Sequence, residues 1–388
     1  MTAHRRLLFV DHAGVMGGAE FSLLDVVGAF LPGSEVMLLA DGPFRVALEA
    51  RGVPVQMESL GALGRVKKRG TFPPIGALAD AARVGRRLAA RTHAFDALYA
   101  NSQKAFIVSA AAGWWSRCPV IWHLRDILGA PHFSDTNVRA VVWLANRCAV
   151  RVIANSRATA AAFQAAGGNA SRVRVVHNGI DPAPFDAVTD HAARECRQAL
   201  GVPGNVPLVL HVGRFHHWKG QQILLRALAQ ETRAHAWIVG ASLFGEEEFA
   251  IELRAEAAQR GLADRVHFLG FRDDVPLLMK AADIVVHSSV YPEPFGRVVV
   301  EGMLAGRPVI AAAAGGVTEI ITDGETGWLV PPNDPASLAQ ALGRAIDNPQ
   351  LAAGVAARGA AHARQVFTRE AMIRGVTEAV ESLATSAR

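Results

Sequence analysis

The sequence predicts an α/β protein of two tandem domains, each built on a parallel sheet covered by helices. Its 388 residues suffice for two hydrophobic cores of ordinary size. Short apolar or β-branched runs alternate with Ala-rich segments of helical period, which is typical of parallel sheets with both faces covered. The alternation pauses once, in the Pro-rich stretch 178–185, which we interpret as a linker. Two α/β domains in tandem are expected to face a cleft at their strand ends.

The individual elements follow from the same patterns. Runs of Val, Ile and Leu that are too short for helices are the predicted strands of the first half: 7–10, 35–39, 53–57, 97–100, 120–122, 152–154 and 173–176. Longer periodic segments between them are its predicted helices: 21–30, 44–50, 75–90, 138–149 and 158–166.

The second half repeats this alternation. Its predicted strands are 208–212, 236–239, 266–269, 284–287, 309–312 and 327–330. Its predicted helices include 222–229, 247–259 and 336–346.

Composition excludes several classes of protein. With 51% hydrophobic and 19% charged residues, the chain is globular rather than disordered. No apolar run reaches the roughly 18–20 residues that span a bilayer. The apolar segment after Arg5-Arg6 is too short for a signal peptide. Three scattered cysteines without metal-ligand spacing favour a cytoplasmic protein with reduced thiols.

Charge is distributed unevenly along the chain. Lys and Arg outnumber Asp and Glu by 21 to 12 in residues 1–185, but are outnumbered by 19 to 23 in residues 186–388. Much of the excess lies in the run 65–69 and in the arginines of segment 83–91. This asymmetry predicts that the first half meets an anionic partner, and without a basic-aromatic RNA motif we favour a membrane surface over nucleic acid. The alternative is that these arginines only solvate helix faces.

Two glutamates bracket a predicted turn from strand to helix. Glu293 precedes Pro-Phe-Gly, and Glu301 lies about a turn and a half into the following helix. A rise of about 1.5 Å per residue separates the two carboxylates by about 8–10 Å along the helix axis. The helix N-terminus between them is a natural phosphate site. Either glutamate alone could be a capping or solvated residue, but together they predict a nucleotide-sugar site.

Cations are expected at the end of another strand. The strand 208–212 runs into Gly213 and Arg214, and Lys219 precedes the next helix. Arg and Lys beside a helix N-terminus can neutralise a diphosphate. Two surface cations are the alternative.

Two further features of the first half could carry chemistry. Gly17 and Gly18 follow the first strand and would let the backbone approach a ligand, although a tight turn explains them equally well. His123 follows strand 120–122, so we expect it to point from the strand end toward the cleft, with Arg125 and Asp126 able to orient or charge it. A lone histidine is more often structural.

Taken together, these motifs resemble the retaining glycosyltransferases of family 4, which have the GT-B fold of two Rossmann-like domains. The resemblance covers most of the chain. It is carried by a series of short motifs: Gly17-Gly18-Ala-Glu20, His123, Asn178-Gly-Ile-Asp181, Gly213-Arg214, Lys219-Gly220, Phe268-Leu-Gly-Phe271, Glu293–Glu301, Gly315-Gly316 and Asp323-Gly-Glu-Thr-Gly327. The Glu-to-Glu spacing with Phe-Gly inside is the most specific of them.

The resemblance implies a role for each site residue. Arg214 and Lys219 would hold the diphosphate, Glu293 the transferred sugar and Glu301 the ribose. Backbone N–H groups of Phe295, Gly296 and Arg297 would bind sugar and phosphate. Gly17, Gly18 and Gly213 would contact the phosphate. Arg272 and Asp274 would contact the base. His123 would position or polarise the sugar. We expect no metal and no cofactor besides a UDP- or GDP-linked sugar as co-substrate.

The resemblance also implies a domain plan and an activity. We expect an acceptor-binding domain at 1–183, a nucleotide-sugar domain at 184–365 and a last helix within 366–388 that returns to the first domain. The expected activity is transfer of a hexose, with retention, to a glycan or lipid-linked acceptor in polysaccharide biosynthesis, by a cytoplasmic enzyme peripheral to the inner face of the plasma membrane. The alternatives are a nucleotide-sugar 2-epimerase or hydrolase, and a non-catalytic sugar-nucleotide sensor.

Overall fold

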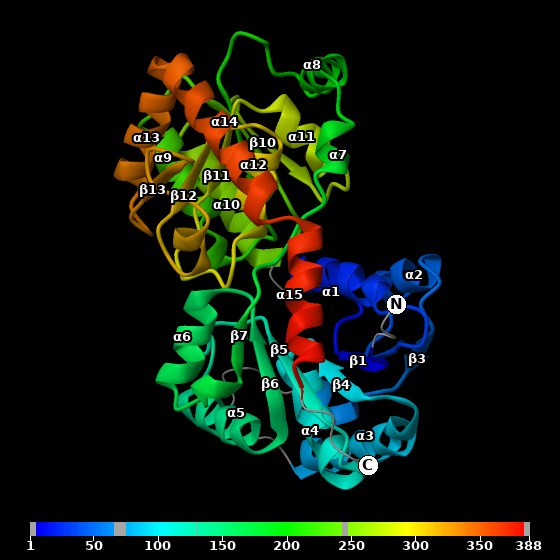
Figure 1. The fold of residues 1–388 in the computed structure, drawn as a ribbon. Coiled ribbons are helices and arrows are strands. Elements are labelled where there is room, and N and C mark those ends of the chain that lie inside the picture. The colour runs from blue at the N-terminus through cyan, green and yellow to red at the C-terminus, as the bar shows by residue number, and fades with distance from the viewer. Residues whose placement is uncertain (1–4, 66–74, 130, 243–246, 384–388) are drawn as a thin grey trace. The chain divides into compact units, whose positions relative to one another are not determined.

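The computed structural model describes residues 5–65, 75–129, 131–242 and 247–383. It divides into two compact units: unit 1 contains the chain up to Gly179 together with the last helix, and unit 2 is Ile180–Thr368. Each has the α/β architecture with a parallel sheet that the sequence predicts (Figure 1). The boundaries expected from sequence were 183/184 and 365/366. Of the basic run 65–69, residues 66–69 lie outside the described residues.

Unit 1 contains a seven-stranded sheet of order β3-β2-β1-β4-β5-β6-β7, in which every described pair is parallel. The strands are β1 (Leu7–Asp11), β2 (Glu35–Leu38), β3 (Val55–Met57), β4 (Ala97–Ala100), β5 (Val120–Leu124), β6 (Ala149–Ala154) and β7 (Val173–Val175). The helices are α1 (Gly18–Ala29), α2 (Pro43–Ala50), α3 (Ile75–Arg91), α4 (Gln103–Ser116), α5 (Asp135–Cys148), α6 (Arg157–Ala165) and α15 (Arg369–Glu381).

Alternate residues of these strands enter two cores, one on each face of the sheet. Leu8, Val10 and Trp122 pack with α3 to α6 on one face. Phe9, Tyr99 and the other alternate positions pack with α1, α2 and α15 on the opposite face. The last helix lies beside α1, so the C-terminal segment completes the core of the unit in which the chain begins (Figure 1).

Helix α4 was not among the helices predicted from the sequence. This helix is apolar or small on most sides, and its buried positions include Ala105, Phe106 and Ser109. It therefore lacks the polar stripe by which an amphipathic helix is recognised. The sequence does contain a signal for the start of this helix, because serine is a preferred N-cap residue. In the structure, Ser102 caps α4 by accepting a hydrogen bond from the Ala105 N–H at 3.3 Å.

Unit 2 contains a six-stranded parallel sheet of order β10-β9-β8-β11-β12-β13. The strands are β8 (Leu208–Val212), β9 (His235–Val239), β10 (Val266–Gly270), β11 (Ile284–His287), β12 (Val309–Ala312) and β13 (Trp328–Val330). The helices are α7 (Ala183–Asp186), α8 (Asp190–Ala199), α9 (Gln221–Leu228), α10 (Glu247–Gln259), α11 (Val275–Ala281), α12 (Arg297–Leu304), α13 (Pro335–Asp347) and α14 (Pro349–Val366). Within the described residues, no helix has both the length and the apolarity to cross a membrane.

Candidate active site

The predicted site residues of unit 2 gather at the point where its strand order reverses. Strands β8 and β11 are hydrogen-bonded neighbours, but the chain goes from β8 toward β9 on one side and from β11 toward β12 on the other. Ligands of open parallel sheets bind in the crevice that such a reversal leaves at the carboxyl ends of the strands. Gly213, Arg214 and Lys219 follow β8, and Glu293 follows β11.

The Lys219 loop is fixed against the end of β11. Gly220 has φ +72°, and a Cβ there would lie 1.8 Å from the Ser288 carbonyl oxygen. The Ser288 hydroxyl donates to the Gly220 carbonyl at 2.8 Å, and the His211 Nε2 lies 3.2 Å from the Lys219 carbonyl. Close packing thus requires glycine at position 220 and places Lys219 over the neighbouring strand.

The Glu293 carboxylate is the centre of a buried polar cluster. Its Oε1 accepts a hydrogen bond from the Lys219 ammonium and another, at 2.8 Å, from the Ser289 hydroxyl. The His287 Nε2 lies 3.5 Å from the same oxygen and 3.2 Å from the Ser289 Oγ. Among the described residues, every hydrogen bond and ion pair of this side chain uses Oε1. The other carboxylate oxygen is therefore available to a ligand.

These contacts determine the ionisation of the cluster. Burial by itself would raise the pKa of Glu293, but Lys219 and the hydrogen bond from His287 outweigh burial and hold that pKa well below its usual range. Burial and the neighbouring His287 lower the pKa of His211 to about 3. At neutral pH, Glu293 is therefore an anion and His211 is neutral.

Trp218 supports both predicted phosphate-binding cations. The Arg214 Cζ lies 5.1 Å from the centroid of its ring, and the Lys219 Nζ lies 5.8 Å from it. Cations within about 6 Å of an indole face are attracted to its electron density. Both long cationic side chains thus contact the same indole, which restricts where their charges can go.

The second glutamate lies in a short helix that begins where the sequence predicts. Gly296 has φ +106° and caps α12, so the helix N-terminus directly follows Phe295-Gly296. Glu301 is half-buried and pairs with Arg297 at 3.3 Å. The Phe295 ring is buried in the core, so only its backbone can contact a ligand.

The predicted base-contacting residues lie farther along the same sheet edge. Arg272 and Asp274 follow β10, and the Arg272 Nε donates to Asp274 Oδ1 at 2.8 Å. This pairing raises the pKa of Arg272 and lowers that of Asp274. Within the described chain, the two bind each other rather than the Lys219–Glu293 cluster.

His123 lies at the carboxyl end of β5, one residue before the last of the strand. Strand β5 continues to Leu124, so His123 lies inside it and is fully buried. Its Nδ1 is hydrogen-bonded to the Tyr99 hydroxyl. Burial, with a contribution from Arg125, lowers its pKa well below the usual value. The imidazole is therefore neutral, and Arg125 does not help to charge it.

The glycine turn of unit 1 leads directly into α1. Gly17 caps that helix, and its φ of −138° is ordinary extended backbone. Because Gly17 has no side chain, the Glu20 carboxylate can approach it closely; a Cβ on Gly17 would lie 2.9 Å from Glu20 Oε2. Burial and the nearby Asp11 carboxylate raise the pKa of Glu20 to about 7.

A buried polar network lies at the carboxyl ends of the central strands of unit 1. Asn101 donates to Asp11 at 2.6 Å and accepts from the Arg125 Nε at 3.0 Å. The Arg125 Nη1 donates to Asn178 at 2.7 Å. This network ties the last residue of β1 to residues that follow β4, β5 and β7. It places Arg125, rather than His123, beyond the end of β5.

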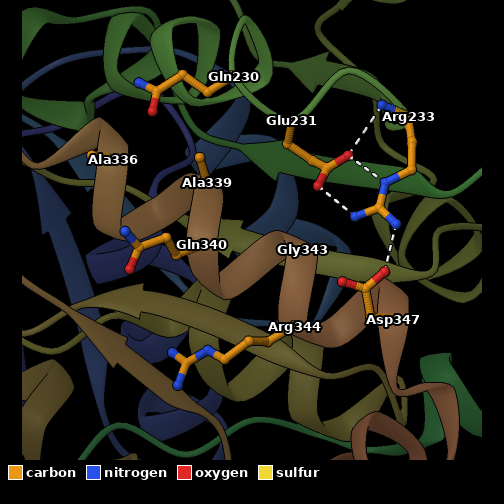
Figure 2. A pocket seen from close by; sticks show the side chains of 9 residues that line it. All are labelled: Gln230, Glu231, Arg233, Ala336, Ala339, Gln340, Gly343, Arg344 and Asp347. Carbon is orange, nitrogen blue, oxygen red and sulfur yellow. Dashed lines mark hydrogen bonds and ion pairs between the residues drawn. The ribbon is translucent and has the colours of Figure 1, made fainter.

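A separate hollow of unit 2 lies between the loop before β9 and helix α13 (Figure 2). Figure 2 shows the Arg233 guanidinium turned toward Glu231 and Asp347, which it contacts at 2.8 and 2.5 Å. One guanidinium thus bridges two carboxylates. None of the predicted site residues lines this hollow.

Sequence reasoning overlooked His287, Ser289 and Trp218 as members of the site. A signal for the first two was present, since a polar His-Ser-Ser run ends an otherwise apolar strand at the same sheet edge as Lys219. Trp218 carried a weaker signal, namely an aromatic residue directly before the predicted cation.

Comparison with known proteins agrees with this geometry. Residues 193–362 match the family model described as "Glycosyl transferases group 1", and residues 16–184 match "Glycosyltransferase Family 4". HepE of Anabaena, solved in complex with UDP and glucose, is 40% identical with a TM-score of 0.90 over 98% of this chain and 100% of that one. The chain belongs to family 4 of the glycosyltransferases, and its two units are the Rossmann-like domains of the GT-B fold.

One further relative is similar over part of the chain, and a second structure of HepE is similar over almost all of it. The D-inositol 3-phosphate glycosyltransferase of Streptomyces scabiei is 34% identical over 229 residues, which cover 56% of this chain and 50% of that protein. The chain spans about half the length of the curated relatives it matches. A second structure of HepE contains UDP-glucose and is 41% identical, with a TM-score of 0.89 over 98% of this chain and 100% of that one.

Proposed function

We propose that the protein is a retaining hexosyltransferase that moves a hexose from a nucleotide-sugar donor to a glycan or lipid-linked acceptor without a metal ion. The observation that carries this proposal is the cluster at the end of β8 and β11, where Lys219 and Glu293 meet beside the N-terminus of α12. The UDP-glucose complex of HepE supports a UDP-linked sugar as the donor.

The residues divide the chemistry between charge and position. Arg214 and Lys219 would bind the diphosphate, and their charges stabilise the negative charge that develops as the anomeric C–O bond breaks. The available Oε2 of Glu293 would accept hydrogen bonds from sugar hydroxyls, while Glu301 would accept from the ribose. Retention follows if the acceptor oxygen bonds to the anomeric carbon on the face that the diphosphate leaves and gives its proton to the departing oxygen.

Unit 1 would contribute to the same reaction through residues the family resemblance assigns. We propose that the backbone of Gly17 and Gly18 contacts the diphosphate, and that His123 positions the transferred sugar. Since burial keeps His123 neutral, it would act through a hydrogen bond rather than as a cation. Gly213, Arg272, Asp274, Phe295, Gly296 and Arg297 keep their proposed places around the nucleotide.

The direct test is transfer activity of Lys219→Ala and Glu293→Ala. Each is expected to lower kcat/KM by roughly 100-fold or more, because each removes a charge aimed at the reacting bond. Arg226→Ala is the matched control, since Arg226 forms a comparable ion pair with Glu256 outside the cluster. Full activity of both site variants would refute the assignment.

Two other functions use the same donor site and can be separated from transfer. A nucleotide-sugar 2-epimerase or hydrolase would convert the donor with no acceptor present. A non-catalytic sensor would bind the donor tightly and turn over none of a broad acceptor panel. Incubation with UDP-glucose alone, followed by the acceptor panel, distinguishes the three.

Donor identity and metal independence can be tested together. A bound donor stabilises the folded state in proportion to the logarithm of its concentration over Kd. UDP-, GDP-, ADP- and dTDP-sugars should therefore raise Tm to different extents, with the UDP-sugar highest. Transfer should persist in excess EDTA if the two cations replace a metal, and loss that Mg²⁺ restores would refute this part of the proposal.

We also propose that unit 1 binds anionic membrane surfaces. Helices α3, α4 and α5 pack side by side, and Trp114 and Trp143 are 72% and 60% exposed on the latter two. Arg86 and Arg147 lie over the rings of Trp115 and Trp143, each at 5.4 Å. Exposed tryptophan with arginine suits the boundary between anionic headgroups and acyl chains.

Vesicle sedimentation tests the membrane proposal. The protein should pellet with phosphatidylglycerol vesicles at low salt and be released at high salt, because surface charges are screened within about 10 Å at 0.1 M. Trp114→Ser with Trp143→Ser should weaken pelleting, whereas Phe271→Ser, at an equally exposed aromatic of unit 2, should not. Failure of the unmodified protein to pellet at low salt would favour a soluble acceptor.

A further inference from the structure

The Glu293 carboxylate has more partners than its proposed role as a sugar ligand requires. Lys219, Ser289 and His287 all meet its Oε1. One of these partners, Lys219, is also the residue proposed to bind the diphosphate. The two roles compete for one ammonium group, because a phosphate that arrives beside Lys219 offers it stronger negative charge than a single carboxylate does.

The three partners differ in how firmly they are held. Lys219 reaches Glu293 through a long flexible chain that is 23% exposed. The His287 side chain is 7% exposed at the end of β11, and Ser289 is 2% exposed just beyond it. Short buried side chains at the end of a central strand lose little freedom and keep their geometry, whereas an exposed lysine can turn.

The backbone of Glu293 is fixed separately. The Gly316 N–H donates to its carbonyl at 2.8 Å, and a Cβ at Gly315 would lie 2.2 Å from that oxygen. With the backbone anchored on this loop, the orientation of the carboxylate depends on its side-chain partners. Without Lys219, the buried anion would lose its cationic partner and would depend on its contacts with Ser289 and His287.

We propose that His287 and Ser289 are positioning residues that hold the Glu293 carboxylate in place independently of Lys219, which leaves the Lys219 ammonium free to bind the donor diphosphate. The inference rests on the proposed function of this site. The titratable groups around His287 are Glu293, Lys219 and, on the adjacent strand β8, His211. Ser289 bridges His287 and Glu293. His287 and Ser289, which we call the arm, therefore connect β11 to the carboxylate without involving Lys219.

Kinetics distinguish positioning from general structural damage. Ser289→Ala and His287→Leu should lower kcat by roughly 10- to 100-fold with little change in KM for the donor, because the nucleotide contacts remain. The acid limb of the pH–rate profile should move to higher pH, since the hydrogen bond from His287 lowers the pKa of Glu293. His287→Gln, which keeps an N–H group, should restore part of both. Ser109→Ala, a buried serine of unit 1, is the control.

A second measurement needs no activity, so it separates failure of this inference from failure of the proposed function. Thermal unfolding is compared for Glu293→Gln, Ser289→Ala and their combination, both with Lys219 present and in Lys219→Ala. The combination should lower Tm by roughly 2–6 °C less than the sum of the single shifts in both backgrounds, because the two side chains interact without the lysine.

Three outcomes would overturn the inference. Additive Tm shifts in Lys219→Ala would show that Ser289 does not hold Glu293 when the lysine is gone. An unmoved acid limb with unchanged kcat would show that the arm does not affect Glu293. Loss of the Tm increase that UDP produces in the unmodified protein would show that the substitutions collapse the pocket.

Discussion

At the scale of single residues, burial decides which groups of this protein carry charge. Glu293 is mostly buried and stays ionised because the charge of Lys219 and a hydrogen bond from His287 stabilise its carboxylate. Glu20 is buried next to another carboxylate, and its pKa rises to about 7. Desolvation raises the pKa of both carboxyl groups, and the charge of the nearest neighbour decides the direction of the net shift.

The state of Glu20 predicts how stability depends on pH. Its pKa is higher in the folded protein than the ordinary value of 4.5, so its contribution is fully present below pH 4.5 and is lost as pH rises through about 7. Relative to Glu20→Gln, the unmodified protein should lose up to about 3 kcal/mol of unfolding free energy between pH 4 and pH 8. Urea denaturation across this range measures the difference.

The control is Glu195→Gln, which removes an exposed carboxylate from α8. If the difference between Glu20→Gln and the unmodified protein does not grow with pH, folding does not raise the pKa of Glu20.

At the scale of elements, the site depends on loops that pack without room for a side chain. Gly220 connects the 3-10 turn of His217–Lys219 to α9 and touches the backbone that follows β11. Because the loop packs against both strands, it holds Lys219 in a defined position although Lys219 belongs to neither strand. The position of Lys219 is therefore a property of the β8–β11 pair.

Replacement of Gly220 tests this dependence. Gly220→Ala should cost roughly 3 kcal/mol or more, because a left-handed φ is combined with a clash against the Ser288 carbonyl. Gly261→Ala has nearly the same φ, +67°, but open space around it, and should cost only about 1 kcal/mol. Denaturant midpoints of the two variants make the comparison, and equal costs would mean that the close approach is unimportant.

At the scale of the whole molecule, the last helix belongs to the unit in which the chain begins. Met372 on α15 is buried, and its sulfur accepts a hydrogen bond from the Gly179 N–H at 3.2 Å. Val376 and Val380 join the core formed by α1 and β1. The chain thus leaves unit 1 at Gly179 and returns to it after Thr368.

Truncation of this contact should destabilise unit 1. Met372→Ala is expected to cost about 2–5 kcal/mol, as for other buried methionines. UDP should still raise the unfolding temperature of unit 2, because the proposed donor contacts lie there. Met57→Ala, at an exposed position, is the control and should change stability by about 0.5 kcal/mol or less. Calorimetry with and without UDP would reveal a wrong assignment if both units lost stability equally.

The sequence by itself determined the alternation of strands and helices, the two parallel sheets and the residues that follow β8 and β11. These properties are local, because side-chain periodicity and turn residues record how each short segment folds. The turn after β11 likewise predicted a helix N-terminus between Glu293 and Glu301, and α12 begins there. Helix α4 escaped because it has no polar face to give it a period.

Only the tertiary structure decided what surrounds each residue. His123 was expected to point from its strand end and is buried beside Tyr99, while Lys219 meets Glu293 from 74 positions away in the chain. Such meetings depend on strand order and register, which join residues far apart in the chain and leave no periodic trace in it. Burial and charge, and with them the ionisation of Glu20 and Glu293, exist only once those distant segments have packed.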